Sequence, residues 1–226
     1  MIDAILNSAF FGLTLSTAAW CFGRWVQKKT GWVICNPLLV ASLVIIAFLA
    51  VFHIPLEQYN LGGDMIKLML GPVTAVLALN IYQQRKVLGQ YFLPVLAGCL
   101  AGSLASLGSV LLLCRLFAME NSLTVSLLPK SVTTAIAVGI AESRGGIPGI
   151  AAAAVVLAGI VGAVFAPLFA KAFRITDPVA EGLAIGACSH ALGTTKAMEI
   201  GPLQGAMSSI AICVCGIITS ILALFI

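Results

Sequence analysis

A lysine and a group of hydroxyl side chains interrupt a long apolar stretch in the middle of the chain. Residues 127–150 read LLPKSVTTAIAVGIAESRGGIPGI. Pro129 is typical of a helix start, where the first backbone N–H groups have no partner within the helix. Lys130 adds a positive charge, and the hydroxyl side chains that follow it are Ser131, Thr133 and Thr134. Together these groups favour a site for a small anion, especially a carboxylate. The alternative is that Lys130 extends to the membrane interface and that the hydroxyls bond their own helix.

A second short polar segment lies about sixty residues further on and reads GACSHALGTTKAME over residues 186–199. Gly193 allows the backbone to break there, which would free N–H groups beside two hydroxyls. His190 can donate to a substrate oxygen or carry a proton near neutral pH, or it can bond a neighbouring helix. We expect Lys196 and Glu199 to form an ion pair on one helix face. The residues expected to bind substrate in this segment are Ser189, His190, Thr194 and Thr195.

Motifs for other chemistry are missing from the sequence. It has no HExxH, GxSxG or Walker pattern, and the seven cysteines form no CxxC pair. We therefore expect no catalytic residues, no metal site, no cofactor and no enzymatic activity. The net charge of +4 is small and spread along the chain, so we expect no nucleic-acid partner.

The composition places the chain in a membrane. Of its 226 residues, 61% are hydrophobic and 9% are charged, and the mean hydropathy is +1.11. Soluble domains carry about 25% charged residues, so one water-soluble core cannot hide this much apolar surface. The sequence predicts an integral membrane protein whose helices span the lipid bilayer.

Windows without charged residues predict the individual helices. Six are long enough to span: Ala4–Gly23, Thr30–Leu56, Leu68–Gln84, Val87–Cys114, Gly145–Ala170 and Ile200–Ile226. Two more, Ser131–Ala141 and Gly182–Thr195, are short and rich in small or hydroxyl residues. Short interrupted segments of this kind mark the binding sites of transporters. We predict an all-α polytopic, transporter-like protein with about eight membrane segments, of which some are broken or re-entrant.

The chain also repeats itself weakly. Residues 73–82 read VTAVLALNIY and residues 132–141 read VTTAIAVGIA, with four of ten positions identical. Thr74 and Asn80 therefore match Thr133 and Gly139, and they are candidates to line the same cavity. Asn36 is a further candidate, with a helix cap as its alternative role. We predict a single membrane domain, residues 1–226, with repeat units at about 30–115 and 120–226.

Four stretches resemble the LrgB/CidB family of membrane proteins. They read NPLLVA from residue 36, LLPKSVTTAIA from 127, GGIPGIAA from 145 and SHALGTTKAMEIG from 189. The resemblance implies two functions for this family. Bacterial members act as antiholin-like regulators of murein hydrolases and autolysis with a small LrgA/CidA-type membrane partner. Plant relatives exchange glycolate and glycerate, and some bacterial pairs are associated with pyruvate uptake.

The anion-receptive segments favour transport of a small monocarboxylate of the glycolate, glycerate, pyruvate or lactate class. The alternative is the antiholin-like regulation of murein hydrolase activity and autolysis. In either case we expect a multi-pass protein of the bacterial cytoplasmic (inner) membrane. Its expected partners are the lipid bilayer, a small carboxylate substrate, an LrgA/CidA-type protein, which would be a separate chain, and further copies of itself.

Overall fold

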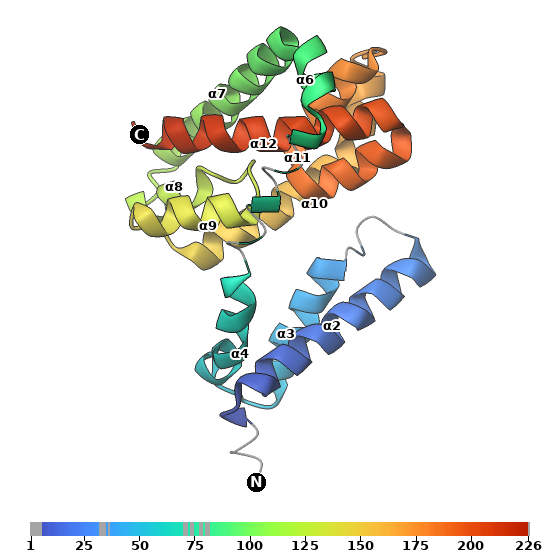
Figure 1. Cartoon of the computed structure of the whole chain (residues 1–226). Coiled ribbons are helices and arrows are strands. Elements are labelled where there is room, and N and C mark those ends of the chain that lie inside the picture. Colours follow the sequence, from blue (N-terminus) through green and yellow to red (C-terminus); the bar gives the residue numbers. More distant parts are fainter. Residues whose placement is uncertain are drawn as a thin grey trace. The chain divides into compact units, whose positions relative to one another are not determined.

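The described part of the chain is entirely helical. The computed structural model describes residues 6–31, 35, 37–69, 72, 75, 76, 79 and 82–225, which form ten helices and no strand. This confirms the predicted all-α polytopic fold. The chain divides into two compact units, Met1–Val73 and Thr74–Ile226, and Figure 1 labels the helices of each.

The first unit consists of three helices that pack through small residues. They are α2 (Ala9–Thr30), α3 (Pro37–Val51) and α4 (Leu56–Leu68). A side chain at Gly23 would overlap the backbone of Pro37, and Gly12 lies against Gly62 in the same way. These glycines let the helices approach closely, which is how apolar helices pack in lipid. Ser16 and Tyr59 add a hydroxyl–hydroxyl hydrogen bond of 2.8 Å between α2 and α4.

The second unit contains three helices long and apolar enough to cross a membrane among the described residues. The helices of this unit are α6 (Arg85–Gln90), α7 (Phe92–Leu116), α8 (Asn121–Leu127), α9 (Thr134–Ser143), α10 (Pro148–Ala172), α11 (Pro178–Ile200) and α12 (Pro202–Ala223). The three spanning helices are α7, α10 and α12. Exposed leucines follow one face of α7 at helical spacing: Leu93, Leu96, Leu100 and Leu104. In a bilayer such a face contacts lipid.

Helices α8 and α9 form a re-entrant hairpin, which we call hairpin 1. The N–H of Ile147, just after α9, donates to the hydroxyl of Ser126 in α8 at 2.6 Å. After α9 the chain thus returns to the end of α8. α9 has ten residues, so at 1.5 Å per residue it rises about 15 Å, half the bilayer core. The tip of hairpin 1, residues 128–133, therefore lies near the middle of the membrane.

Helix α11 also doubles back, at His190, and we call it hairpin 2. His190 has φ 40° and ψ −137°, far from helical values. A side-chain carbon placed at Gly193 would lie 3.0 Å from Cγ2 of Ile185. Eight residues of straight helix would separate these positions by about 12 Å. The two arms must therefore lie side by side, and Gly193 lets them close.

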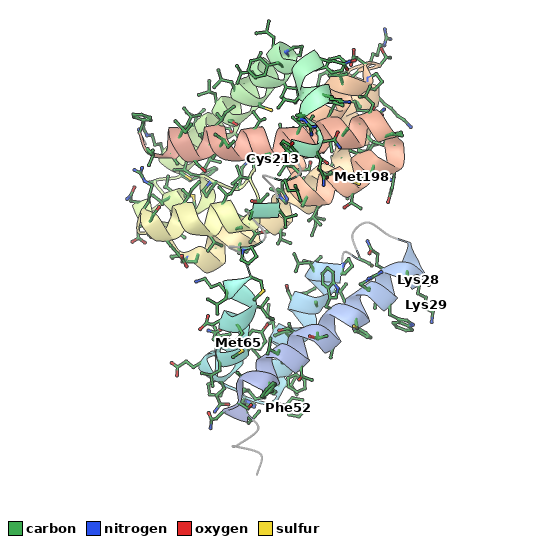
Figure 2. The ribbon with its side chains drawn as sticks, viewed as in Figure 1. Lys28, Lys29, Phe52, Met65, Met198 and Cys213 are labelled. Atoms are coloured by element: carbon green, nitrogen blue, oxygen red, sulfur yellow. The ribbon has the colours of Figure 1, made fainter. Side chains whose placement is uncertain are left out.

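Contacts with α12 confirm this reversal. In the first arm, Gly182 lies against Gln204, and Gly186 lies against Ser208. In the second arm the order is inverted, because Thr194 bonds Ser208 while Met198 packs on Gly205. Both arms thus use the same half of α12, and Figures 1 and 2 show α11 and Met198 at that half. The predicted broken or re-entrant segments are confirmed.

The two hairpins enter the unit from opposite sides. The end of α7 and the start of α10 both lie beside α8, on the side where hairpin 1 enters. Arg144, at the end of α9, donates to the carbonyl of Ala223 at the end of α12. On the other side, Gln204 near the start of α12 donates to Glu181 of hairpin 2 at 3.2 Å. The structure thus contains two repeats of inverted orientation. The first consists of α7 and hairpin 1, and the second consists of α10 and hairpin 2.

The ends of the two repeated helices are built alike. Ala118 after α7 has φ 48° and Arg174 after α10 has φ 53°. Met119 N–H donates to the carbonyl of Cys114 at 2.9 Å, and Ile175 N–H donates to that of Ala170 at 2.8 Å. In each case a residue with positive φ ends the helix. The N–H of the next residue donates to the carbonyl five positions before that next residue, as in a Schellman motif. Inverted repeats with discontinuous helices are common in secondary transporters.

The opposed hairpins predict a labelling pattern. Ser143 lies at the base of hairpin 1 and Thr176 at the base of hairpin 2, and both are exposed. In a variant whose three non-buried cysteines, Cys21, Cys35 and Cys188, are serine, we expect Ser143→Cys and Thr176→Cys to react with a membrane-impermeant maleimide from opposite sides of sealed vesicles. Labelling of both from the same side would contradict the inverted arrangement, and labelling after permeabilisation is the control.

Candidate functional site

Lys130 lies at the tip of hairpin 1 in a small cluster of hydroxyls. Its Nζ is 3.4 Å from Oγ of Ser106 on α7 and 3.4 Å from Oγ of Ser131. The two serine hydroxyls bond each other at 2.7 Å. Contacts of 3.4 Å are long for hydrogen bonds, and an ammonium has three N–H donors. In the described part of the chain no carboxylate pairs with Lys130. The cluster thus has unused capacity to bind an anion.

The next residues carry this polar surface to the start of α9. Thr133 is the N-cap of α9, but its side chain makes no capping bond. Its Oγ1 is buried and has no hydrogen-bond partner. Buried polar atoms are nearly always paired, so an unpaired one indicates a ligand or water. Thr134 is the first residue of the helix.

His190 fixes the tip of hairpin 2 against the spanning helix α10. Its Nε2 lies 2.7 Å from the carbonyl oxygen of Val155, so the Nε2–H donates. The ring is buried against Gly159, where a side chain would overlap it. Ser189 is fully buried next to Gly162, and its hydroxyl has no partner. Each hairpin tip therefore carries one unpaired buried hydroxyl.

The remaining predicted residues of hairpin 2 divide into two groups. Thr194 is buried and bonds Oγ of Ser208 at 2.7 Å and the carbonyl of His190 at 3.0 Å. Thr195 is exposed and donates to the carbonyl of Ala191 at 3.2 Å, so it lies apart from the buried cluster. Lys196 and Glu199 form the predicted ion pair, with Nζ and Oε2 2.7 Å apart.

The two tips meet at the first half of α10. Val132 and Ala137 of hairpin 1 pack against the side chain of Val155, whose carbonyl accepts the bond from His190. Cys188 of hairpin 2 is a neighbour of the Lys130 ammonium. One residue of α10 is thus shared by both predicted segments. That they enclose a polar cavity stays a prediction.

Sequence reasoning missed the contributions of the spanning helices. Ser106 on α7 and Ser208 on α12 contact predicted site residues. Ser103, one turn before Ser106, is buried and its Oγ is unpaired. Hydroxyls spaced three apart in an otherwise apolar helix were the available signal. The predicted cavity-lining residues Asn36, Thr74 and Asn80 lie outside the described residues.

The arrangement can bind a small anion through one cation and several hydroxyl donors. Among the described residues, no group of three or more His, Cys, Asp or Glu side chains is placed to hold a metal ion. The predicted substrate-binding residues stay predictions, since the structure shows only where they lie.

Comparison with known proteins decides the family. The model of the LrgB-like family matches residues 16–226. The chain belongs to the LrgB-like family. It is 38% identical to the Antiholin-like protein LrgB of Bacillus subtilis (strain 168), over 94% of this chain and 92% of that protein. It is 37% identical to the Antiholin-like protein LrgB of Bacillus mycoides (strain KBAB4), over 93% and 92%. No solved structure matches the chain.

Family membership extends over both hairpins and the three spanning helices, because the match begins at residue 16 and ends at 226. With three helices able to span and bacterial relatives of nearly equal length, the chain is a multi-pass bacterial membrane protein. The resemblance to LrgB/CidB proteins is thereby confirmed.

The backbone at His190 gives a stability prediction. A residue with a Cβ held at φ 40° and ψ −137° stores about 1–3 kcal/mol of backbone strain, whereas glycine adopts positive φ freely. His190→Ala and His190→Gly both lose the bond to Val155, but only alanine keeps the strain. We expect His190→Ala to lower the free energy of unfolding by about 1–3 kcal/mol more than His190→Gly, measured by denaturant unfolding in detergent. Ala118→Gly, at another positive φ, is the matched control and should stabilise. Equal stability of the two His190 variants would contradict the positive φ at this position.

Proposed function

We propose that the chain is an antiholin-like regulator of murein hydrolase activity and autolysis. The supporting observation is the similarity to proteins named Antiholin-like protein LrgB, at 37–38% identity over more than nine-tenths of both chains. Because the similarity covers more than nine-tenths of both chains, it includes the membrane helices and both hairpins. The regulation is non-enzymatic and takes place in the cytoplasmic membrane.

The architecture suits a protein that acts through membrane partners. Large apolar side chains stay exposed on α7 and α10, for example Leu104, Leu157, Phe165 and Leu168. In lipid such faces contact acyl chains or other helices. A small LrgA/CidA-type membrane protein and further copies of this chain are the partners we propose for them.

The test is the rate of autolysis in a bacterium that carries this gene. Removing the gene should accelerate detergent-induced lysis and raise murein hydrolase activity in zymograms, because an antiholin-like protein opposes lysis. Expression of the wild-type chain should restore the slower rate. An unchanged lysis rate after deletion, with protein production in the wild type verified by immunoblot, would contradict the proposal.

A second candidate function is transport of a small monocarboxylate, and the Lys130 cluster favours it. Charged groups inside a membrane unit are costly and usually mark a site or pathway. Here an ammonium that no described carboxylate contacts lies at the tip of one of two opposed hairpins. Binding sites of inverted-repeat transporters lie at such helix breaks.

In this function Lys130 would hold the carboxylate of glycolate, glycerate, pyruvate or lactate. Ser131, Thr133 and the N–H groups that open α9 would donate further hydrogen bonds. From hairpin 2, the free hydroxyl of Ser189 and the Thr194–Ser208 pair would contact the hydroxyl or keto oxygen of the substrate. His190 would hold the tip in place through Val155, and Thr195 has no direct role in this arrangement.

Substitution of Lys130 tests this site. Losing one charge-assisted hydrogen bond costs roughly 1.5–3 kcal/mol, or about tenfold to a hundredfold in affinity. We expect Lys130→Ala to weaken carboxylate binding by that factor and Lys130→Arg to weaken it less, because arginine keeps the charge but changes its geometry. Calorimetry with each of the four carboxylates, and uptake into vesicles that contain the purified protein, would measure this.

Lys196→Ala is the matched control, because Lys196 is paired with Glu199. It should leave binding unchanged. Carboxylate binding by folded Lys130→Ala at wild-type affinity would remove Lys130 from the site. Vesicles that leak solutes of every charge would favour the antiholin-like function alone.

A further inference from the structure

A cavity of about 270 Å³ lies between the end of α7 and the first arm of hairpin 1. We call it the Arg115 cavity. Its polar wall consists of Arg115, Asn121 and Thr124, and its apolar wall includes Leu111, Val125 and Leu128. The lining contains no carboxylate. A cavity with one cation, two neutral polar groups and an apolar wall suits an amphiphile with a negative charge.

Arg115 lies at the depth where lipid head groups begin. It is the second-last residue of α7, a helix of 25 residues with high hydropathy. Such a helix spans the apolar core, about 30 Å, so that its end reaches the interface. Within the described residues, the Arg115 guanidinium has no hydrogen-bond or ion-pair partner. Its five donors are free for a ligand.

The Arg115 cavity is separate from the Lys130 cluster. A layer of buried side chains closes its inner end: Leu107, Val110, Cys114 and Leu128. Lys130 follows Leu128 in hairpin 1, and Ser106 precedes Leu107 in α7. Both therefore lie on the other side of this layer. A ligand in the Arg115 cavity therefore does not reach the Lys130 ammonium.

The inverted repeat supplies an internal comparison. The equivalent cavity between the end of α10 and the first arm of hairpin 2 also measures about 270 Å³. Its lining is apolar apart from Glu181, Cys188 and Ser189. Lys171, the second-last residue of α10 as Arg115 is of α7, does not line it. Only the hairpin 1 side of this pair combines a cation with a polar cavity.

We propose that the Arg115 cavity binds the head group of an anionic phospholipid. The guanidinium fork donates two parallel hydrogen bonds to phosphate oxygens, a geometry that arginine matches well. The amide of Asn121 donates to the ester oxygens. The hydroxyl of Thr124, which donates to the carbonyl of Glu120 at 3.1 Å, accepts from a glycerol hydroxyl of the head group. The wall of Leu111 and Val125 packs against the first carbons of an acyl chain. Binding there would hold hairpin 1 against α7 at the membrane surface.

The experiment measures phosphatidylglycerol binding to the purified full chain by native mass spectrometry and by the lipid-induced rise in melting temperature. Phosphatidylcholine and inorganic phosphate are run in parallel. We expect wild type to bind phosphatidylglycerol in preference to phosphatidylcholine. Arg115→Gln should lower the affinity for phosphatidylglycerol about tenfold or more, the loss expected for a charge-assisted contact. The affinity of Arg115→Lys for phosphatidylglycerol should lie between those of wild type and Arg115→Gln.

Lys171→Gln is the control, because it removes one positive charge at the matching position of α10. Wild-type affinity in Lys171→Gln together with loss in Arg115→Gln supports the cavity. Equal losses in both variants would reduce the effect to surface charge and overturn the proposal. Competition by inorganic phosphate at the concentration of the lipid would assign the cavity to free phosphate instead. Phosphatidylcholine binding as tight as phosphatidylglycerol binding would also overturn it.

Discussion

The structure depends on the need to satisfy backbone polar groups in the middle of a bilayer. A helical hairpin that turns back halfway leaves N–H and C=O groups at its tip without water, and irregular backbone at that depth must be covered by protein. Part of this need is met within the tips, where the N–H of Lys130 donates to the carbonyl of Leu127 and the hydroxyl of Thr194 donates to that of His190. Both tips are covered by the same helix. The backbone carbonyl of Val155 in α10 accepts the hydrogen bond from the His190 ring. The side chain of Val155 belongs to one buried cluster with Val132. The arrangement of the three spanning helices follows from covering the two tips.

Small residues make this coverage close enough. A side chain at Gly159 would overlap the His190 ring, and one at Gly162 would overlap Ser189. Gly182 and Gly186 bring the first arm of hairpin 2 against the α12 backbone in the same way. In lipid no hydrophobic force drives helices together, so close van der Waals contact has to supply the attraction. The glycines thus determine where the hairpin can turn.

The sequence predicted the class, the three spanning helices α7, α10 and α12 and the two polar segments, because long apolar windows and proline starts are local signals. The windows Ala4–Gly23 and Thr30–Leu56 correspond to α2 and α3, which are not among the helices long and apolar enough to span. The window Leu68–Gln84 lies partly outside the described residues. It also predicted the ion pair of Lys196 and Glu199, which are three residues apart on one helix. It did not predict that Ser106 and Ser208 join the cluster, since those contacts link distant helices. The inverted order of the repeat was equally hidden: it rests on contacts of hairpin 1 with the end of α12 and of hairpin 2 with its start. Sequence similarity between two apolar helices does not show whether the repeats that contain them are parallel or inverted.

The charge of Lys130 connects the two proposed functions. An ammonium at a hairpin tip inside a membrane protein loses much of its hydration, and the described neighbours offer hydroxyls and a thiol but no negative charge. A bound anion would lower that cost, so it would favour the conformation in which hairpin 1 lies closed against α7 and α10. If the anion passes through, the result is transport. If it stays, the hairpin becomes a sensor whose closed state depends on the anion concentration, and exposed helix faces that bind partners would respond to it. The same site would thus suit either of the two proposed functions.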